Sequence, residues 1–370
     1  MAPEDLDDGD PLSTATLVYV APRSGSSGVS DYADDILKEA RAALGSVVEV
    51  RHGGAGADSV AQVRAGRKAV ARAVRAAEGA VIVHTEQSGG VLLPFWSLTL
   101  RAVRDERVLR SATLHDAPLG VWLPLRSKGV SRSRLITHAL HYPFMAVHRR
   151  VERRVFHGVA LTALTESGAE AIESELGHDS VRASFLPAPA RDAILPAPRR
   201  PLAIGLFGYV YKGKGFDQLS RLRELVDPDI DIRVAGRGTL DLPSIDGVTL
   251  IGGVEGPDED RFFESVRAIV LPYSRRSSYG PATHVASSVV ARAIAYETPV
   301  IALRYLGLAD EGEVVDGDIA DLARAVNRIV RDADEIGALA ARSADLKRRL
   351  TAPAAFSVLA GLWRERLRSA

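Results

Sequence analysis

The stretch Thr14–Gly45, TATLVYVAPRSGSSGVSDYADDILKEARAALG, joins a β-branched run, a glycine-containing turn and a segment with helical spacing. Thr14–Val20 has the composition of a buried strand. Ser30 or Asp31 is placed to cap the following helix and Gly45 to end it. One face of that helix is apolar: Tyr32, Ile36, Leu37, Ala40 and Leu44. We therefore predict a βα unit at the start of a parallel sheet.

The same alternation of strands and helices continues along the chain. Before residue 190 the predicted strands are Val47–Val50, Ala80–His84, Val108–His115, Val159–Leu164 and Val181–Leu186. After residue 200 they are Leu202–Phe207, Ile230–Ala235, Val248–Ile251, Ala268–Pro272 and Pro299–Leu303. This pattern predicts an α/β protein with two Rossmann-like domains whose strand ends face a central cleft.

Composition shifts suggest the domain boundaries. We expect an acidic flexible tail over residues 1–12 and a first Rossmann-like domain over 13–188. Five prolines in residues 187–201 predict a stiff hinge at 189–201. A second Rossmann-like domain follows over 202–351. The last segment, 352–370, carries an apolar helical stripe: Phe356, Leu359, Trp363 and Leu367.

Charge and composition exclude several classes of protein. The 370 residues include 47 Lys plus Arg and 47 Asp plus Glu, so no net basic field favours nucleic acid. Without cysteine there is no disulfide, thiolate nucleophile or cysteine zinc site. Residues 1–10 contain five acids and no Lys or Arg, unlike a signal peptide, and the apolar stretch Val91–Leu100 is too short to span a bilayer. We expect a cytoplasmic protein.

The turn after the first predicted strand contains Gly25 and Gly28, at the amino end of a helix. Backbone N–H groups there can receive a phosphate or a sugar hydroxyl, although the glycines also suit a simple tight turn. The spacing is not G-x-G-x-x-G, but Glu49 ends the second strand, where a ribose-binding acid would lie. A nicotinamide oxidoreductase is therefore an alternative.

A second glycine-rich loop opens the second half of the chain. Gly208–Gly215 has the pattern G-x-x-x-x-G-K-G, in which Gly215 replaces the magnesium-binding hydroxyl of a nucleotide triphosphatase. Lys212 and Lys214 lie between a strand and a helix, where they can neutralise a diphosphate. The alternative is that both are solvated loop lysines.

His115 and Asp116 follow the fourth predicted strand, at its carboxyl end. A histidine at this position can bind a phosphate or a sugar hydroxyl, or act as an acid or base near neutral pH. The alternative is a hydrogen-bonded interior histidine.

The stretch Arg126–His157 holds eight Lys or Arg and one acid, Glu152, among apolar residues. It can contact an anionic membrane surface at the inner face, although solvated helix surface is the commoner role of such charges. His138 and His141 are one helical turn apart, but no third ligand is identifiable, so we predict no metal site.

Six segments, taken in order, resemble the retaining GT-B glycosyltransferases of family four. They are the glycine loop and helix GVSDYADDILKEA, the histidine strand end TLHDAP, the donor-phosphate loop FGYVYKGKGFDQL, and the segments DIRVAGRG, RAIVLPY and AYETPVIA. The resemblance extends over nearly the whole chain.

This resemblance implies a hexosyltransferase that moves a sugar from a nucleotide diphosphate donor to an acceptor with retention of configuration. The second domain would hold the donor and the first the acceptor, without metal or cofactor, in polysaccharide or glycolipid assembly. Lys214 matches the family lysine, and Gly28 and His115 match its glycine loop and histidine. Tyr209 or Tyr211 replaces the family arginine, with Lys212 as a substitute. The last helix, with Trp363, would cross back onto the first domain.

The chain departs from the family at its two donor-binding glutamates. One register places His284 and Arg292 there, and another places Ser277 and Val285, so neither supplies a carboxylate. Some branches use serines and N–H groups at a helix start instead, a role for Ser287 and Ser288. The donor-binding candidates are thus Lys212, Tyr211, His284, Ser287, Ser288 and Arg292. An alternative is an inactive GT-B-like protein that binds a nucleotide sugar or a partner.

Overall fold

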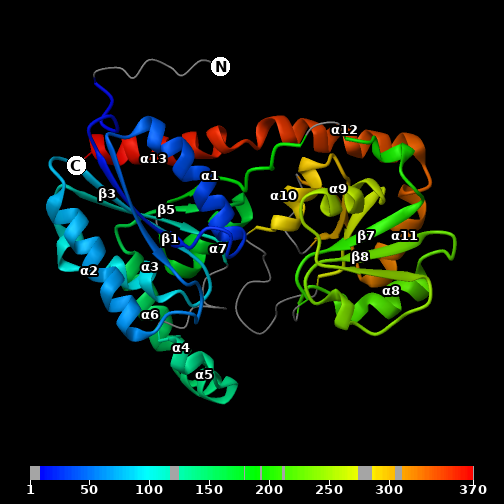
Figure 1. Cartoon of the computed structure of the whole chain (residues 1–370), viewed down its shortest axis with the longest axis horizontal. Helices are drawn as coiled ribbons and strands as arrows, with labels where there is room; N and C mark the ends of the chain where they lie inside the picture. Colours follow the sequence, from blue (N-terminus) through cyan, green and yellow to red (C-terminus); the bar gives the residue numbers. More distant parts are fainter. Residues whose placement is uncertain are drawn as a thin grey trace. The chain divides into compact units, whose positions relative to one another are not determined.

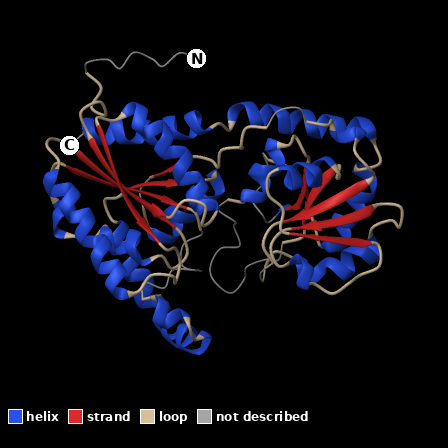
Figure 2. Cartoon of the chain, viewed as in Figure 1, coloured by secondary structure: helices blue, strands red, loops and turns tan. Residues whose placement is uncertain are grey.

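The computed structural model describes residues 9–116, 125–178, 180–191, 194–210, 213–273, 286–304 and 311–369. These residues form two compact units. Unit 1 comprises the described residues up to Leu186, together with Ala286 and residues 352–369. Unit 2 comprises the described residues of 187–273 and 287–351. Each unit is a parallel sheet covered by helices, which confirms the predicted α/β class (Figures 1 and 2).

The sheet of unit 1 has six strands in the order β2-β1-β3-β4-β5-β6, all paired in parallel. They are β1 (Thr16–Pro22), β2 (Ser46–His52), β3 (Val81–Gln87), β4 (Val108–Leu114), β5 (Ala160–Ala163) and β6 (Val181–Ala183). Each lies where the sequence predicts a strand. The main differences are β3, which continues three residues beyond the predicted end at His84, and β6, which ends three residues before the predicted end at Leu186.

The helices of unit 1 cover both faces of this sheet. They are α1 (Gly28–Ala43), α2 (Val60–Ala76), α3 (Leu92–Ser97), α4 (Lys128–Ser131), α5 (Arg134–His141), α6 (Met145–Phe156), α7 (Glu166–Leu176) and α13 (Ala352–Arg368). Short 3-10 turns are η1 (Arg101–Arg104) and η2 (Tyr142–Phe144). One apolar core joins α1 and α13 to β1, and another joins α2 to the opposite face of the strands. No helix in the described part of the chain combines the length and apolar composition needed to cross a bilayer.

The amino end of α1 differs from the prediction. Ser27, and not Ser30 or Asp31, is the capping residue, because the Ser27 hydroxyl accepts from the Ser30 N–H. Ser30 is its partner in a capping box, with its own hydroxyl accepting from the Ser27 N–H at 2.9 Å. The helix therefore begins at Gly28, three residues after Gly25, and the turn before it is shorter than the sequence suggests.

The carboxyl-terminal helix α13 packs on unit 1. Its apolar stripe lies against α1, with Trp363 fully buried. At the other end of the chain, the Arg364 guanidinium donates to both carboxylate oxygens of Asp10, and Leu12 is buried in the same core. The packed structure thus includes Asp10 and Leu12, which differs from the flexible tail predicted over residues 1–12.

Unit 2 contains a second six-stranded parallel sheet, in the order β12-β11-β10-β7-β8-β9. Its strands are β7 (Ala203–Phe207), β8 (Asp231–Ala235), β9 (Val248–Gly252), β10 (Ala268–Leu271), β11 (Val300–Leu303) and β12 (Glu313–Val315). The three-residue strand β12 was not predicted from the sequence. The helices are α8 (Leu219–Leu225), α9 (Pro257–Glu264), α10 (Ser288–Ala295), α11 (Ile319–Ile329) and α12 (Ala333–Arg349), with short turns η3 (Ala197–Arg199), η4 (Phe216–Gln218) and η5 (Thr239–Asp241).

The end of the proline-rich segment is part of unit 2. Arg200 is 1% exposed, and its guanidinium donates to the Leu195 and Tyr296 carbonyls, each at 2.8 Å, and to Thr298 Oγ1 at 2.7 Å. A buried arginine with this many acceptors fixes the backbone on either side of it. Residues 195–200 are therefore anchored in unit 2, and a hinge within 189–201 remains a prediction.

One residue of α6 is buried at a cost in stability. The Glu152 side chain is 1% exposed, and neither carboxylate oxygen has a hydrogen-bond partner. Burial raises the pKa of Glu152 to about 8, although Arg149 opposes this effect. The folded protein thus holds a proton that the unfolded chain releases above pH of about 4.5.

We expect Glu152→Gln to stabilise unit 1 by about 4 kcal/mol at pH 8 and by little at pH 5. In the wild type, the stability contributed by the bound proton is complete below pH of about 4.5 and is lost as the pH rises through about 8. Tryptophan fluorescence in urea titrations reports this unit, because both tryptophans of the described residues, Trp96 and Trp363, belong to it. Glu170→Gln, on the exposed surface of α7, is the matched control. An effect of Glu152→Gln that does not change with pH would show that Glu152 is ionised in the folded protein.

Candidate functional site

Each sheet reverses its strand order at one point. In unit 1 the reversal lies between β1 and β3, and in unit 2 between β7 and β10. In open α/β sheets ligands bind beyond the carboxyl ends of the strands at such a point. The turn containing Gly25 follows β1, and the loop containing Lys214 follows β7. The predicted glycine turn and lysine loop therefore each lie at the reversal point of their own sheet.

His115 follows β4 and is nearly buried, with 7% of its side chain exposed. Its Nε2 lies 2.6 Å from Glu86 Oε2, and its ring packs edge-on against Tyr32 with the ring centroids 5.0 Å apart. An ionised carboxylate only accepts hydrogen bonds, so His115 donates through Nε2. Nδ1 is then the ring nitrogen left for a further interaction.

Glu86, near the end of β3, is fully buried and accepts three hydrogen bonds. The donors are His115, the Tyr19 hydroxyl and His84 Nε2, which lies 3.0 Å from Oε1. Burial alone would raise the pKa of Glu86, but the hydrogen bonds from His115 and His84 outweigh it and lower the pKa to about 2. A fixed negative charge thus lies inside the sheet directly behind His115.

The hydrogen-bond network continues from Glu86 to the last helix of the chain. Trp363 Nε1 donates to Ser111 Oγ at 2.9 Å, and Ser111 Oγ lies 3.0 Å from His84 Nδ1. The indole N–H can only donate, so Ser111 Oγ accepts from it and uses its own hydrogen to donate to His84 Nδ1. His84 then carries its proton on Nε2, which points to Glu86. The network fixes the tautomers of both histidines and links α13 to the end of β4.

Sequence reasoning identified His115 but missed Glu86. The available signal was the run His84–Gln87, HTEQ, directly after three apolar strand residues. Polar residues that continue a buried strand must find partners inside the sheet. The run therefore indicates a buried hydrogen-bond network, but it does not identify the side chains that complete the network.

The glycine turn of unit 1 uses part of its own hydrogen-bonding capacity. Gly25 has a φ of 70°, which a glycine adopts without strain, and Gly28 is the first residue of α1. The N–H groups of Ser26 and Ser27 both donate to Ser30 Oγ. Among the described N–H groups of this turn, those two are already occupied, which leaves fewer for a ligand than the sequence suggests.

Glu49 does not lie free at the end of its strand. Its carboxylate accepts from Arg41 and from Arg51, with Arg51 Nε at 2.9 Å. A ribose hydroxyl would have to compete with two guanidinium groups for these oxygens. This arrangement weighs against the nicotinamide oxidoreductase.

In unit 2, two predicted residues are brought together by a third that was not predicted. Lys214 Nζ lies 2.7 Å from the Tyr273 hydroxyl and 4.0 Å from the centre of its ring. The same hydroxyl lies 3.5 Å from Ser287 Oγ. Ser287 precedes α10 as its capping residue, and Ser288 is the exposed first residue of that helix. A cation and the amino end of a helix therefore meet at Tyr273, just beyond β10.

Glycine is required where these loops approach each other. Gly215 has a φ of 76°, and a Cβ there would lie 1.9 Å from the Pro272 carbonyl oxygen. A Cβ on Gly236 would lie equally close to the carbonyl oxygen of Gly208. Only glycine allows these close backbone contacts, which hold the lysine loop against the ends of β8 and β10.

Arg292, a predicted donor-binding residue, is engaged within unit 2. Its guanidinium donates to the carboxylate of Glu259, a residue of α9 that is 1% exposed. Arg191 Nη2 lies 3.4 Å from the other oxygen of that carboxylate. About a third of the Arg292 side chain is exposed. The predicted residues Tyr211, Lys212 and His284 lie outside the described residues, as do Ser277 and Val285 of the alternative register.

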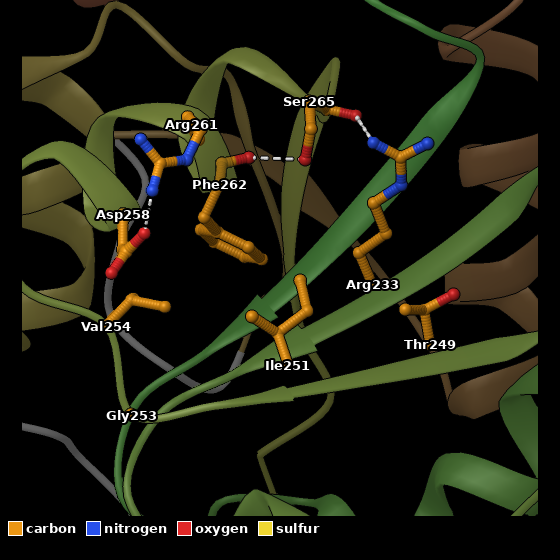
Figure 3. A pocket seen from close by; sticks show the side chains of 9 residues that line it. All are labelled: Arg233, Thr249, Ile251, Gly253, Val254, Asp258, Arg261, Phe262 and Ser265. Carbon is orange, nitrogen blue, oxygen red and sulfur yellow. Dashed lines mark hydrogen bonds and ion pairs between the residues drawn. The ribbon is translucent and has the colours of Figure 1, made fainter.

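A separate pocket of unit 2 lies between α9 and the strands β8 and β9, of which β9 is at the edge of the sheet (Figure 3). Arg261 pairs with Asp258 at one end, and Arg233 donates to the Ser265 carbonyl at 3.1 Å at the other. Phe262 lies between them. None of the predicted site residues lines it. In the described part of the chain, no group of three His, Asp or Glu side chains is placed to hold a metal ion.

No family model and no curated protein matches this sequence. Solved structures do match its fold. HepE from Anabaena, solved with UDP and glucose, superposes with a TM-score of 0.64 at 13% identity, over 96% of this chain and 100% of HepE. The catalytic domain of starch synthase IV from Arabidopsis thaliana, bound to ADP and acarbose, gives 0.64 at 11% identity, over 97% and 100%. AviGT4, a glycosyltransferase involved in avilamycin A biosynthesis, gives 0.56 at 14% identity, over 96% and 98%.

These structures share two Rossmann-like units with the present chain. The chain has the GT-B fold. At these identities the match establishes the GT-B fold alone. The predicted fold class is confirmed, whereas membership in family four remains a prediction. Within the GT-B fold, the described site residues form two groups: His115 with Glu86 in unit 1, and Lys214 with Tyr273 and Ser287 in unit 2.

Proposed function

We propose that this GT-B protein is a glycosyltransferase that moves a sugar from a nucleotide diphosphate donor to an acceptor. The observation that carries the proposal is the meeting of Lys214, Tyr273 and the start of α10 at the strand reversal of unit 2. The structures with this fold include HepE with UDP-glucose and starch synthase IV with ADP, which supports a nucleotide-sugar donor.

In the proposed reaction, unit 2 stabilises the departing diphosphate. The N–H groups of Val290 and Ala291 already donate to the Ser287 carbonyl, whereas the earlier N–H groups of α10 have no partner within the helix. Those N–H groups, the helix dipole and the Lys214 ammonium all favour negative charge at one place. They act most strongly on the charge that appears as the glycosyl bond breaks.

Unit 1 contributes His115. With Nε2 donating to Glu86, Nδ1 accepts a hydrogen bond from a sugar hydroxyl and so orients the reacting sugar. Gly28 and the start of α1 supply further N–H groups at the same edge of the sheet. We further propose, from the resemblance to family four, retention of anomeric configuration, with cationic side chains in place of a metal ion.

We expect thermal-shift experiments with UDP, ADP and their sugars to identify the one nucleotide that stabilises the folded protein. A ligand present at about 100 times its Kd adds about 2.7 kcal/mol to the stability of the folded protein. The matching nucleotide sugar is expected to be hydrolysed slowly without acceptor, releasing nucleoside diphosphate and a free sugar. Proton NMR of the first-formed sugar gives its anomeric configuration.

The outcomes separate the candidate functions. Binding of a nucleotide sugar without any release of diphosphate would favour the inactive GT-B-like protein, which the fold matches to transferases and synthases do not favour. Quenching of NADH fluorescence would instead favour an oxidoreductase. An inverted product would leave transfer in place and contradict retention.

A further inference from the structure

The residues 125–154, here called the basic arm, expose an unusual number of large apolar side chains. Of eleven such exposed side chains in the described chain, six belong to this segment. They are Leu125, Leu135, Ile136, Tyr142, Phe144 and Val147, and Leu135 is 82% exposed. Such a concentration of exposed apolar side chains indicates a surface that binds a membrane, a ligand or another protein.

The basic arm keeps its shape without burying these side chains. Helix α5 packs mainly on α4 and η2, and in Figure 1 α4 and α5 extend away from the sheet of unit 1. Thr137 Oγ1 donates within this segment, with the Val130 carbonyl at 3.1 Å and the Ser133 carbonyl at 3.0 Å. The apolar residues are therefore held outward by an ordered helix pair.

The same surface is strongly basic. Arg150 and Arg154 are exposed on α6, where Arg150 lies one turn after Val147 on the same face. Lys128 and Arg132 are exposed on and beside α4. The single acid of this segment, Glu152, is buried. The exposed charged side chains of the basic arm are thus cationic, and Arg149 is paired with Glu175 of the neighbouring α7.

We propose that the basic arm docks this protein on an anionic membrane surface, with Leu135, Ile136, Phe144 and Val147 entering the interface. Amphipathic helices that pair an apolar face with Lys or Arg lie in the headgroup layer of anionic bilayers. A second copy of the chain fits this surface poorly, because a two-fold interface would bring two basic patches together. If the protein is the proposed glycosyltransferase, docking at this surface implies that its acceptor substrate is held in the membrane.

The test is flotation of the purified full chain with phosphatidylcholine vesicles, with and without about one-third phosphatidylserine. We expect binding only to the anionic vesicles, and a fall in binding between about 0.1 M and 0.5 M NaCl. Leu135→Ser/Ile136→Ser is expected to weaken binding by about tenfold or more. Arg150→Glu/Arg154→Glu is expected to weaken it by a similar factor.

Leu240→Ser is the matched control, since Leu240 is 67% exposed in unit 2 and is expected to leave binding unchanged. Equal binding to neutral and anionic vesicles, or equal effects of the control and the Leu135 variant, would overturn the proposal. The proposal would also be overturned if the wild type did not bind vesicles and instead formed a dimer that the Leu135 variant no longer forms. Donor hydrolysis on the same preparations, without vesicles, reports the proposed function separately.

Discussion

Replacing Glu86 by Gln is expected to remove about 3 kcal/mol of the stability of unit 1 at pH 7. The pKa of Glu86 is about 2 in the folded protein, against 4.5 as its ordinary value. Its contribution is therefore complete above pH of about 4.5 and is lost as the pH falls toward 2. A glutamine amide at this position also presents N–H groups to side chains that themselves donate, namely Tyr19, His84 and His115.

Urea unfolding followed by tryptophan fluorescence measures this loss, at several pH values between about 3 and 7. Glu49→Gln is the matched control, because it removes a carboxylate of the same sheet whose ion pairs lie near the surface. Its expected cost is below about 1 kcal/mol. Two results would show that Glu86 is not ionised within the network. One is an equal loss of stability in the two variants, and the other is a difference in unfolding free energy between Glu86→Gln and the wild type that stays the same in acid.

The Glu86 variant also tests how His115 is held. Nitrogen-15 NMR of the wild-type His115 ring is expected to show the tautomer with its proton on Nε2, and Glu86→Gln is expected to change that pattern. Turnover is expected to fall together with the change in tautomer. An unchanged His115 spectrum in the variant would assign Glu86 to stability alone.

The second large effect is expected from Lys214→Met, which we predict to lower kcat by about 10²- to 10³-fold. The variant removes a cation that lies against Tyr273 beside the start of α10, and this charge acts on the diphosphate as it departs. Because it acts mainly on developing charge, we expect kcat to change more than KM. Donor hydrolysis and transfer rates, measured with the nucleotide sugar found by thermal shift, give both values.

Two variants make the Lys214 result specific. Lys68→Met removes an exposed lysine of α2 and is expected to leave kcat unchanged. Tyr273→Phe keeps the ring on which Lys214 lies but removes its hydroxyl, and is expected to cost less than Lys214→Met. Full activity of Lys214→Met would exclude this lysine from the reaction and remove the main support for the proposed function.

The sequence by itself determined the order and type of the elements. Apolar periodicity and glycine or proline punctuation are local properties, so the strands from Thr16–Pro22 to Val300–Leu303 lie where those signals predict them. Local signals also placed His115 at a strand end and Lys214 in a loop. They failed to choose between capping residues that lie within one turn of each other, as at Ser27, and they did not identify the short strand β12.

Only the tertiary structure decided which distant side chains meet. Glu86 receives donors from β1, β3 and the residue after β4, Trp363 reaches Ser111 across 252 positions, and Tyr273 joins Lys214 to Ser287. Such contacts depend on which strands and loops are neighbours in the fold, which the pattern of residues within one segment does not specify. The pairing of Arg292 with Glu259 has the same origin, since the carboxylate comes from a different helix. Both carboxyls are buried, so hydrogen-bond donors decide their charge. At pH 7 Glu86, with three donors, is ionised, whereas Glu152, with none, is protonated.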